Sequence, residues 1–422
     1  MKTLFSFNQK QPMKRLLLFV FILLCSASVF SQKAKKLKLK KGAWVSELIL
    51  NETDILPFEM IVHKHKRKYE LTVVNGDEKI KLDEPIIKDD SIIVRFPFFN
   101  SELRFRVNNK KAISGYWHNY NKGPNYKIPF TSGRSKGYRF SRINTNGSDT
   151  DYGGRWKVTF EPNTNSSYPA VGIFKQTENS VTGTFLTETG DYRYLAGNTT
   201  SDSLYLSCFD GSHAFLFKAK YEQDTLYGKF CSGNHWKSEW VAHKNDSFTL
   251  TNPEELTYLK DENDLTFTLK DLDGNEFTYP SDEFKNKVTI IQIMGSWCPN
   301  CLDETHYYKQ LFEKYHDSGL EVIAIGYETG NSFEDYSSNL KRLKEKLGLE
   351  FKFIVGGKAS KNLASEHFNM LNEVISFPTS IFIGRDGKVH RVHTGFNGPG
   401  TGSYYTEYVE KTNALIESLL AK

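Results

Sequence analysis

Cysteine, long apolar runs and an excess of one charge are scarce or absent in this sequence. Five cysteines occur among 422 residues, and the single C-x-x-C pair has no second such pair to complete the four ligands of a structural zinc site. After the N-terminal region, no apolar run is long enough to span a bilayer. The formal charge of +5 falls to +1 without residues 1–31, which hold four Lys or Arg residues and no acid. These absences disfavour zinc proteins, membrane-spanning proteins and nucleic-acid-binding proteins.

Residues 1–31 are predicted to be a secretory signal peptide. Lys14 and Arg15 form a charged start, an apolar run occupies residues 16–24, and small residues lead to a cleavage position after Ser31. An uncleaved anchor is the alternative, but the run is shorter than the roughly 20 residues of a membrane helix. We therefore expect an exported chain without a stable membrane anchor.

A lipid anchor is a further alternative at the N-terminus, because Cys25 lies at the end of the apolar run. Leu24, which precedes it, is larger than the small residue found at such sites, so this alternative is disfavoured. The basic segment 32–41 is interpreted as a solvated linker.

Residues 42–250 show short alternating apolar runs separated by turn residues, the pattern of an all-β region. Two related units, 42–150 and 151–250, are indicated by a similar order of strands and turns and by an aromatic start at Trp44 and at Trp156. Such units would form either one large barrel or a pair of sandwiches. The region is expected to serve targeting or client binding rather than a second reaction.

Two clusters of polar residues in the β region resemble functional sites, one a catalytic triad and the other a metal site. Residues 209–213, Phe-Asp-Gly-Ser-His, contain the residue types of a catalytic triad, but a triad is assembled across space, and Asp-Gly favours a tight turn. His63 and His65 share one face of a predicted strand, as two metal ligands could. Lysine and arginine surround them, however, and this like charge disfavours a bound cation. We interpret the first as a hairpin turn and the second as a solvated strand face.

Cys208 and Cys231 could form a disulfide in an exported chain. The strands predicted at 203–208, 213–219 and 226–231 would form a meander in which the first and third strands flank the second. The two cysteines would then lie about 9–10 Å apart, beyond the roughly 7 Å Cα separation that a disulfide allows. We therefore predict no bond between them.

The remaining pair, Cys298 and Cys301, stands between a predicted strand and a predicted helix. Val288–Met294 is apolar and β-branched, and Asn300–Tyr315 has a helical pattern. The unpaired N–H groups at the start of that helix favour a thiolate on the first cysteine, and the second lies one turn further on. This context favours thiol–disulfide exchange over zinc binding or a purely structural disulfide.

Here the chain resembles the TlpA/ResA group of thioredoxin-fold proteins, which are membrane-facing or periplasmic thiol–disulfide oxidoreductases of bacteria. The resemblance covers about residues 262–422, after a polar linker at 251–262. It depends on four motifs: Asp273-Gly274, Trp297-Cys-Pro-Asn-Cys301, Phe377-Pro378-Thr379 and Gly384-Arg-Asp-Gly387. It implies an α/β thioredoxin-like domain at 263–422, following the all-β region, and a periplasmic or cell-envelope location.

The resemblance also implies roles for individual residues. Cys298 would be the nucleophile, Cys301 would resolve the mixed disulfide, and the two would form a redox-active disulfide. Pro378 would be cis and face the cysteines. Together with its neighbours Phe377 and Thr379, and with Trp297 of the cysteine motif, it would bind the substrate chain by strand addition. Phe377 departs from the small or β-branched residue usual at its position, which leaves the substrate preference open.

Acidic residues follow the second cysteine. Glu304 lies three residues after Cys301, at a spacing where ResA-like proteins carry an acid, and would accept the proton of Cys301 if partly buried. The alternative is a first-turn acid that only complements the helix dipole, an interpretation that suits Asp303 better. Gln292 stands where many thioredoxins have a buried acid, and Met294 replaces a frequent aromatic, so altered redox tuning is expected.

The sequence thus predicts an exported thiol–disulfide oxidoreductase that reduces protein disulfides through Cys298 and Cys301. A membrane electron donor would keep the pair reduced, and neither a metal nor an organic cofactor is implied. Two alternatives stay open. One is a peroxiredoxin-like peroxidase, since peroxiredoxins share the fold. The other is a secreted β-type binding protein whose thioredoxin domain is only a scaffold.

Overall fold

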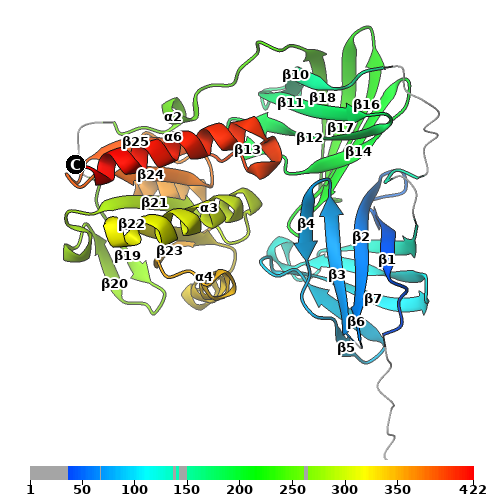
Figure 1. Ribbon diagram of the computed structural model, residues 1–422, viewed down its shortest axis with the longest axis horizontal. Coiled ribbons are helices and arrows are strands. Elements are labelled where there is room, and N and C mark those ends of the chain that lie inside the picture. Colours follow the sequence, from blue (N-terminus) through cyan, green and yellow to red (C-terminus); the bar gives the residue numbers. More distant parts are fainter. Residues whose placement is uncertain (1–36, 67, 136–138, 142–149, 261–264) are drawn as a thin grey trace, which may run out of the picture. The chain divides into compact units, whose positions relative to one another are not determined.

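The computed structural model describes residues 37–66, 68–135, 139–141, 150–260 and 265–422. They form three sheets, two in the N-terminal β region and one in the C-terminal domain (Figure 1). The predicted signal peptide lies outside the described residues. Within the described part of the chain, no helix is both long and apolar enough to cross a bilayer.

The first sheet has nine strands in the order β4-β3-β2-β1-β9-β8-β7-β6-β5. In β1, Trp44, Ser46 and Leu48 are buried and the residues between them are more exposed, as the period of two along a strand requires. The strands of this sheet are β1 (Gly42–Ile49), β2 (Ile55–His65), β3 (Lys68–Asn75), β4 (Glu78–Lys81), β5 (Ile86–Lys88), β6 (Ser91–Arg95), β7 (Ser101–Asn109), β8 (Ala112–Asn119) and β9 (Lys127–Arg134).

The second sheet closes into a barrel. Its order is β11-β10-β18-β17-β16-β15-β14-β12-β13, and β11 also pairs with β12, which joins the two ends. Closure leaves the barrel without the unpaired edges that an open sheet exposes. The strands are β10 (Gly154–Phe160), β11 (Tyr168–Thr177), β12 (Ser180–Thr187), β13 (Gly190–Asp191), β14 (Leu195–Thr199), β15 (Ser203–Phe209), β16 (Ala214–Glu222), β17 (Thr225–Ser232) and β18 (Trp236–Lys244).

The two sheets repeat one strand order, in keeping with the predicted pair of related units. In the first, β1 lies between β2 and β9, and in the second, β10 lies between β11 and β18. The indole N–H of Trp44 donates to the carbonyl of Lys40 at 3.0 Å, and that of Trp156 donates to Tyr152 at 2.9 Å, the same four-residue step. The predicted all-β region, with a barrel as one of its forms, is confirmed.

Aromatic rings fill the interior of the barrel. Trp156, Phe185, Phe217 and Trp240 belong to one buried cluster. Gly228 on β17 faces Trp240 on β18, and a Cβ atom at this glycine would lie 2.0 Å from Cε2 of the indole ring. The glycine therefore makes room for the tryptophan.

Gly228→Ala is expected to destabilise the protein by about 1–3 kcal/mol, the usual cost of overpacking a core. Thermal unfolding followed by circular dichroism should show a lower midpoint. The matched control is Lys229→Ala at the exposed neighbouring position, which should unfold with the wild type. An unchanged midpoint for Gly228→Ala would contradict the close approach of the two strands.

Cys208 and Cys231 are free thiols, as predicted. Strands β15, β16 and β17 form the expected meander, in which Cys208 lies opposite Phe215 and Cys231 lies opposite Leu216. The two cysteines are thus on strands that flank β16 on opposite sides.

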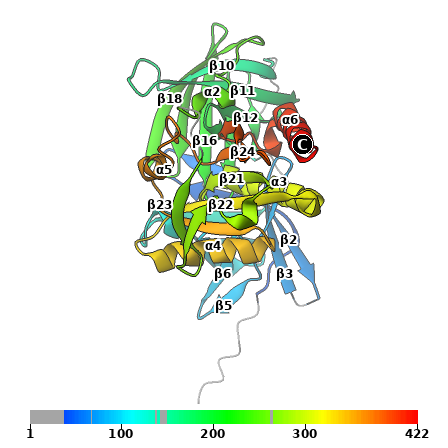
Figure 2. The ribbon, with the colours of Figure 1, turned by 90° about the vertical axis from the view of Figure 1, so that its left-hand side faces the viewer.

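The third sheet is mixed, with the order β20-β19-β23-β22-β21-β24-β25. Strands β21, β22 and β23 are parallel, and the others pair antiparallel. Helix α4 packs along β22 and β23 (Figure 2). The strands are β19 (Phe267–Asp271), β20 (Glu276–Tyr279), β21 (Val288–Met294), β22 (Leu320–Glu328), β23 (Lys352–Lys358), β24 (Thr379–Ile383) and β25 (Val389–Thr394). The helices are α3 (Pro299–Tyr315), α4 (Phe333–Leu347), α5 (Lys361–His367) and α6 (Ser403–Leu420). This is the predicted thioredoxin-like domain.

The segment predicted as a linker is ordered where the structure describes it. Helix α2 (Pro253–Leu256) packs against β25. Leu259 forms a β-bridge with Leu371, and the N–H of Lys260 donates to the carbonyl of Met370 at 2.9 Å. These contacts attach residues 253–260 to the C-terminal domain.

Candidate active site

Cys298 occupies the position where β21 ends and α3 begins. It is the N-cap of α3, and its sulfur accepts a hydrogen bond from the backbone N–H of Cys301 at 3.2 Å. Both cysteines are free thiols in the structure. Cys298 is 8% exposed and Cys301 is fully buried, and burial raises the pKa of the Cys301 thiol. Only the first sulfur is therefore placed to meet another molecule.

The loop before β24 faces Cys298, as the resemblance implies. The Phe377–Pro378 peptide bond is cis, and the Cys298 thiol donates to the Phe377 carbonyl at 3.5 Å. The Phe377 ring packs against Trp297, with ring centres 6.1 Å apart, and stacks on Tyr327 at 5.5 Å. The structure thus brings Trp297 and Phe377 together beside the reactive sulfur, and Thr379 is completely buried.

A buried carboxyl group supports the turn before Cys298. The backbone N–H and the hydroxyl of Ser296 each donate to Glu328 at 2.6 Å. The indole N–H of Trp297 donates to the carbonyl of Tyr327 at 2.9 Å. Burial raises the pKa of Glu328 to about 7, despite the hydrogen bonds from Ser296. Sequence reasoning missed Glu328, although an acid directly after the apolar run at 322–327 was a usable signal.

Glu304 lies beneath the cysteine pair and is completely buried. The side-chain amide of Gln292 donates to the Cys301 carbonyl at 3.2 Å and to Glu304 Oε2 at 2.9 Å, which joins the two residues. Burial raises the pKa of Glu304 to about 7. Gln292, predicted only as the loss of an acid, therefore helps to hold the acid that is present.

Three hydroxyl groups surround the other oxygen of Glu304. Tyr308 and Ser380 each donate to Oε1 at 3.0 Å, and Tyr408 donates at 3.4 Å. The hydroxyls of Tyr308 and Tyr408 lie 2.9 Å apart. A carboxyl group with these partners can exist with or without its proton, which suits a proton acceptor near neutral pH.

Segments of the β region contact the same turn. Residues 209–213 form the predicted turn, in which Asp210 accepts from the N–H groups of Ser212 and His213 at 2.8 and 2.6 Å. The Ser212 hydroxyl also donates to the carbonyl of Trp297 at 2.9 Å. The side-chain amide of Asn300 donates to the carbonyl of Asp191 at 3.3 Å. Sequence reasoning missed these contacts.

Arg193, between β13 and β14, joins three segments that are distant in the sequence. Its buried guanidinium pairs with Glu78 at 2.8 Å and lies 3.6 Å from Asp210, and it also pairs with Asp303 of α3. Asp303 was predicted as a first-turn acid that only complements the helix dipole, but a partner from the barrel neutralises it. Burial raises the pKa of Glu78 and of Asp191, although the Arg193 cation lowers both.

Arg193→Ala is expected to destabilise the protein by about 3–5 kcal/mol, because it leaves buried carboxylates without their cation. Differential scanning calorimetry would measure the loss. The control is Lys220→Ala, which removes an exposed pair with Asp202 from the same barrel and should leave the midpoint near that of the wild type. If both variants unfold alike, the buried pairs of Arg193 do not stabilise the fold.

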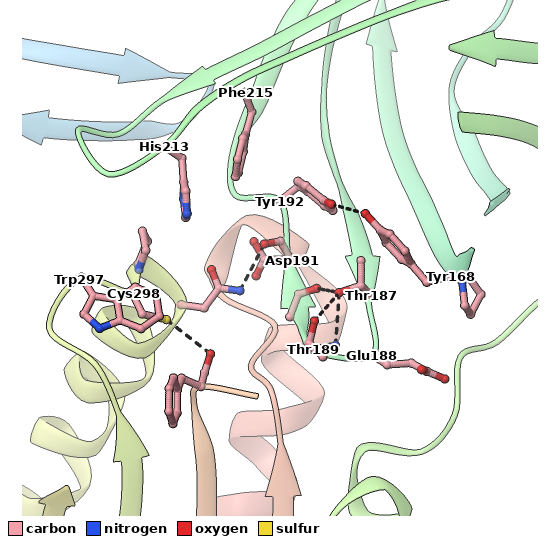
Figure 3. Close-up of a pocket in the computed structure, with 15 residues that line it drawn as sticks. Tyr168, Thr187, Glu188, Thr189, Asp191, Tyr192, His213, Phe215, Trp297 and Cys298 are labelled. Carbon is pink, nitrogen blue, oxygen red and sulfur yellow. Dashed lines mark hydrogen bonds between the residues drawn. The ribbon is translucent and has the colours of Figure 1, made fainter. Parts of the chain in front are cut away.

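A cavity of about 380 Å³ opens beside Cys298 (Figure 3). The C-terminal domain lines it with Trp297, Cys298, Pro299, Asn300 and Phe377. The barrel contributes the rest of the wall: Tyr168, Pro169, Thr187, Glu188, Thr189, Gly190, Asp191, Tyr192, His213 and Phe215.

Among the described residues, no three His, Cys, Asp or Glu side chains are grouped as metal ligands. The His63 and His65 rings lie near each other on β2, but they belong to no such group.

Comparison with known proteins gives a consistent result for the C-terminal domain. The redoxin family model matches residues 261–408. The thiol-disulfide oxidoreductase ResA of Bacillus thuringiensis subsp. konkukian is 28% identical over 147 residues, which cover 34% of this chain and 73% of that protein. A probable glutathione peroxidase 2 of Arabidopsis thaliana is 31% identical over 136 residues, 29% of this chain and 78% of that protein.

Among solved structures, a putative protein disulfide isomerase from Bacteroides thetaiotaomicron aligns with a TM-score of 0.29 and 16% identity, over 39% of this chain and 93% of that one. The family-model match, the ResA relatives and the strand–cysteine–helix geometry agree with the predicted resemblance. The C-terminal part of the chain is therefore a ResA/TlpA-like redoxin domain, that of a thioredoxin-like oxidoreductase, and it follows an N-terminal all-β region.

Proposed function

We propose that this protein is exported and reduces disulfide bonds of client proteins through the dithiol of Cys298 and Cys301. One observation carries the proposal: a nearly buried sulfur at a helix N-terminus borders a cavity, and a second, completely buried sulfur and a buried carboxyl group lie close to it. This arrangement suits two-step exchange, because the first sulfur meets the client and the second stays protected until it is needed.

The first step forms a mixed disulfide. The Cys298 thiolate attacks one sulfur of the client disulfide, the client S–S bond breaks, and the other client sulfur leaves as a thiolate that takes up a proton. The N–H of Cys301, which already points at the Cys298 sulfur, stabilises the attacking charge. Trp297, Phe377, Pro378 and Thr379 would hold the client chain next to the sulfur.

The second step releases the client. Cys301 loses its proton to Glu304 and attacks the Cys298 sulfur, the mixed disulfide breaks, and the second client sulfur leaves as a thiolate. The protein is then left with a Cys298–Cys301 disulfide, and two electrons have moved to the client. A membrane electron donor would return the pair to the dithiol.

Export is supported by the charged and apolar N-terminal segment, which lies outside the described residues. We place the mature protein in the periplasm or cell envelope of a bacterium, where disulfides persist. Fusion of residues 1–31 to a reporter that is active only after export would test this part of the proposal. An inactive fusion would contradict it.

The reductase activity is tested by turnover of a disulfide-bonded protein with the purified full chain. The reduction potential of the Cys298–Cys301 pair, measured in a series of glutathione buffers, would show in which direction electrons move between the pair and the client. A potential near that of thioredoxin, about −270 mV, would support a reductase, and one near −120 mV would indicate an oxidant instead.

Peroxide reduction is the second candidate, because a probable glutathione peroxidase is 31% identical over 136 residues of its alignment with this chain. The C-x-x-C pair favours disulfide exchange, since it holds its own resolving thiol. Consumption of hydrogen peroxide by the full chain, with Cys298→Ser as the control, would separate the two candidates. Peroxide turnover faster than disulfide turnover would favour the peroxidase.

A further inference from the structure

We propose that the mouth of the β10–β18 barrel is a binding subsite for a large apolar or aromatic side chain that flanks the reactive cysteine of the client. The proposal extends the proposed function, because it names the kind of disulfide that the protein prefers. It gives the barrel a direct part in choosing the substrate.

The cavity beside Cys298 has two walls of different origin. On one side are Cys298 and the rings of Trp297 and Phe377 from the thioredoxin-like domain. Opposite them lie Tyr168, Tyr192, His213 and Phe215 of the barrel (Figure 3). The volume of about 380 Å³ falls within the range of about 300–1,000 Å³ that is usual for ligand pockets. A side chain next to a cysteine bound at Cys298 would therefore have room in this space.

The barrel wall is aromatic, and the hydroxyl groups of its two tyrosines are already paired. The hydroxyls of Tyr168 and Tyr192 bond to each other at 2.7 Å, and both rings stack on Phe160, at 5.1 and 5.5 Å between centres. The His213 ring stacks on Phe215 at 4.4 Å. A wall of packed rings with satisfied hydroxyls offers apolar contact to a ligand and little hydrogen bonding.

The acidic groups at the cavity are also occupied. Asp191 accepts from the N–H of Gly398 at 2.7 Å and from the N–H of Arg193 at 2.6 Å. Glu188 accepts from the hydroxyl of Thr251 at 2.6 Å. These pairs leave the carboxylates poorly placed to bind a cationic client, and they would repel an acidic one. The chemistry of the cavity therefore selects an uncharged, bulky side chain.

The shape of the site restricts how a client can approach. Cys298 is nearly buried, and the chain around it is contacted by Ser212 and Asp191 of the barrel. An extended client segment can place one sulfur at Cys298 and the neighbouring side chain in the barrel mouth. We therefore expect the preferred disulfides to lie in unfolded or flexible segments.

The test uses the pre-reduced full chain and three symmetric peptide disulfides, Gly-X-Cys-Gly, in which X is Phe, Ala or Asp. Stopped-flow measurement of the second-order rate of reduction should give a Phe rate at least about tenfold above the Ala rate, because a buried ring gains contacts that a methyl group lacks. The Asp rate should fall below the Ala rate.

Two variants and one control connect the preference to the barrel mouth. Thr189→Trp fills the cavity from an exposed position, and Tyr168→Ser replaces a ring of the wall. Both should bring the Phe-to-Ala ratio close to one. Tyr227→Ser, an exposed tyrosine outside the cavity, should keep the wild-type ratio. Thr189→Trp remains informative if Tyr168→Ser fails to fold.

The outcomes separate this inference from the proposed function. Equal Phe and Ala rates in the wild type, or a ratio that neither variant lowers, would overturn the subsite and leave the reductase intact. A reduced wild-type chain that reacts with none of the peptides would overturn the proposed function and this inference with it.

Discussion

Cys298→Ser is expected to abolish disulfide reduction, with a loss of at least about a thousandfold, since removal of an attacking nucleophile leaves only the uncatalysed exchange. Cys301→Ser should fail differently. Cys298 can still attack, but the mixed disulfide has no nearby thiol to release it. Incubation with a peptide disulfide should therefore leave the Cys301→Ser protein covalently bound to one peptide, which mass spectrometry would detect.

The other cysteines provide the control for this experiment. Cys231 is buried in the barrel, and burial raises the pKa of its thiol, so Cys231→Ser should turn over at the wild-type rate and form no adduct. Adduct formation by Cys298→Ser, through Cys301, would contradict the assigned order of attack. Such a result would mean that the buried sulfur reaches the client first.

The sequence was sufficient for features whose cause is local. Strand β21 spans Val288–Met294 as predicted, because a β-branched apolar run has few alternatives to a buried strand. Helix α3 ends at Tyr315 as expected, and its start beside Cys298 follows from Pro299, which is favoured in a first helical turn. The alternation in residues 42–250 likewise predicted strands, though it left barrel and sandwich equally open.

Features that depend on distant contacts could not be read from the sequence. Arg193 lies 110 residues before Asp303, and nothing near either residue indicates that they pair. Ser212 was correctly placed in a turn, but its contact with Trp297 depends on how the barrel meets the thioredoxin-like domain. The role of Gln292 was also hidden, because a glutamine inside a strand gains meaning only from the carboxyl group it touches.

Glu304→Gln is expected to slow the second step at pH 8 by about a hundredfold or more, because a positioned general base typically contributes about 100- to 10,000-fold. The pKa of Glu304 is about 7, so the wild-type rate of client release should rise as pH passes through 7 and the carboxylate becomes available. The variant should lose that rise. Its amide can keep the three hydroxyl donors on one oxygen, as Glu304 Oε1 does. Single-turnover release from the mixed disulfide, measured between pH 5 and 9, would check both effects.

A stability measurement separates catalysis from folding in this variant. Burial raises the folded pKa of Glu304 above its ordinary value of 4.5, so the stability this group contributes is present below pH 4.5 and is lost as pH rises through about 7. Glutamine has no proton to lose, and Glu304→Gln should therefore unfold at or above the wild-type temperature at pH 8. Glu328 has a pKa raised to the same value but contacts Ser296 rather than the cysteine pair. Glu328→Gln should thus keep the rise in release rate near pH 7, and if it loses the rise while Glu304→Gln keeps it, the proton acceptor is Glu328 instead.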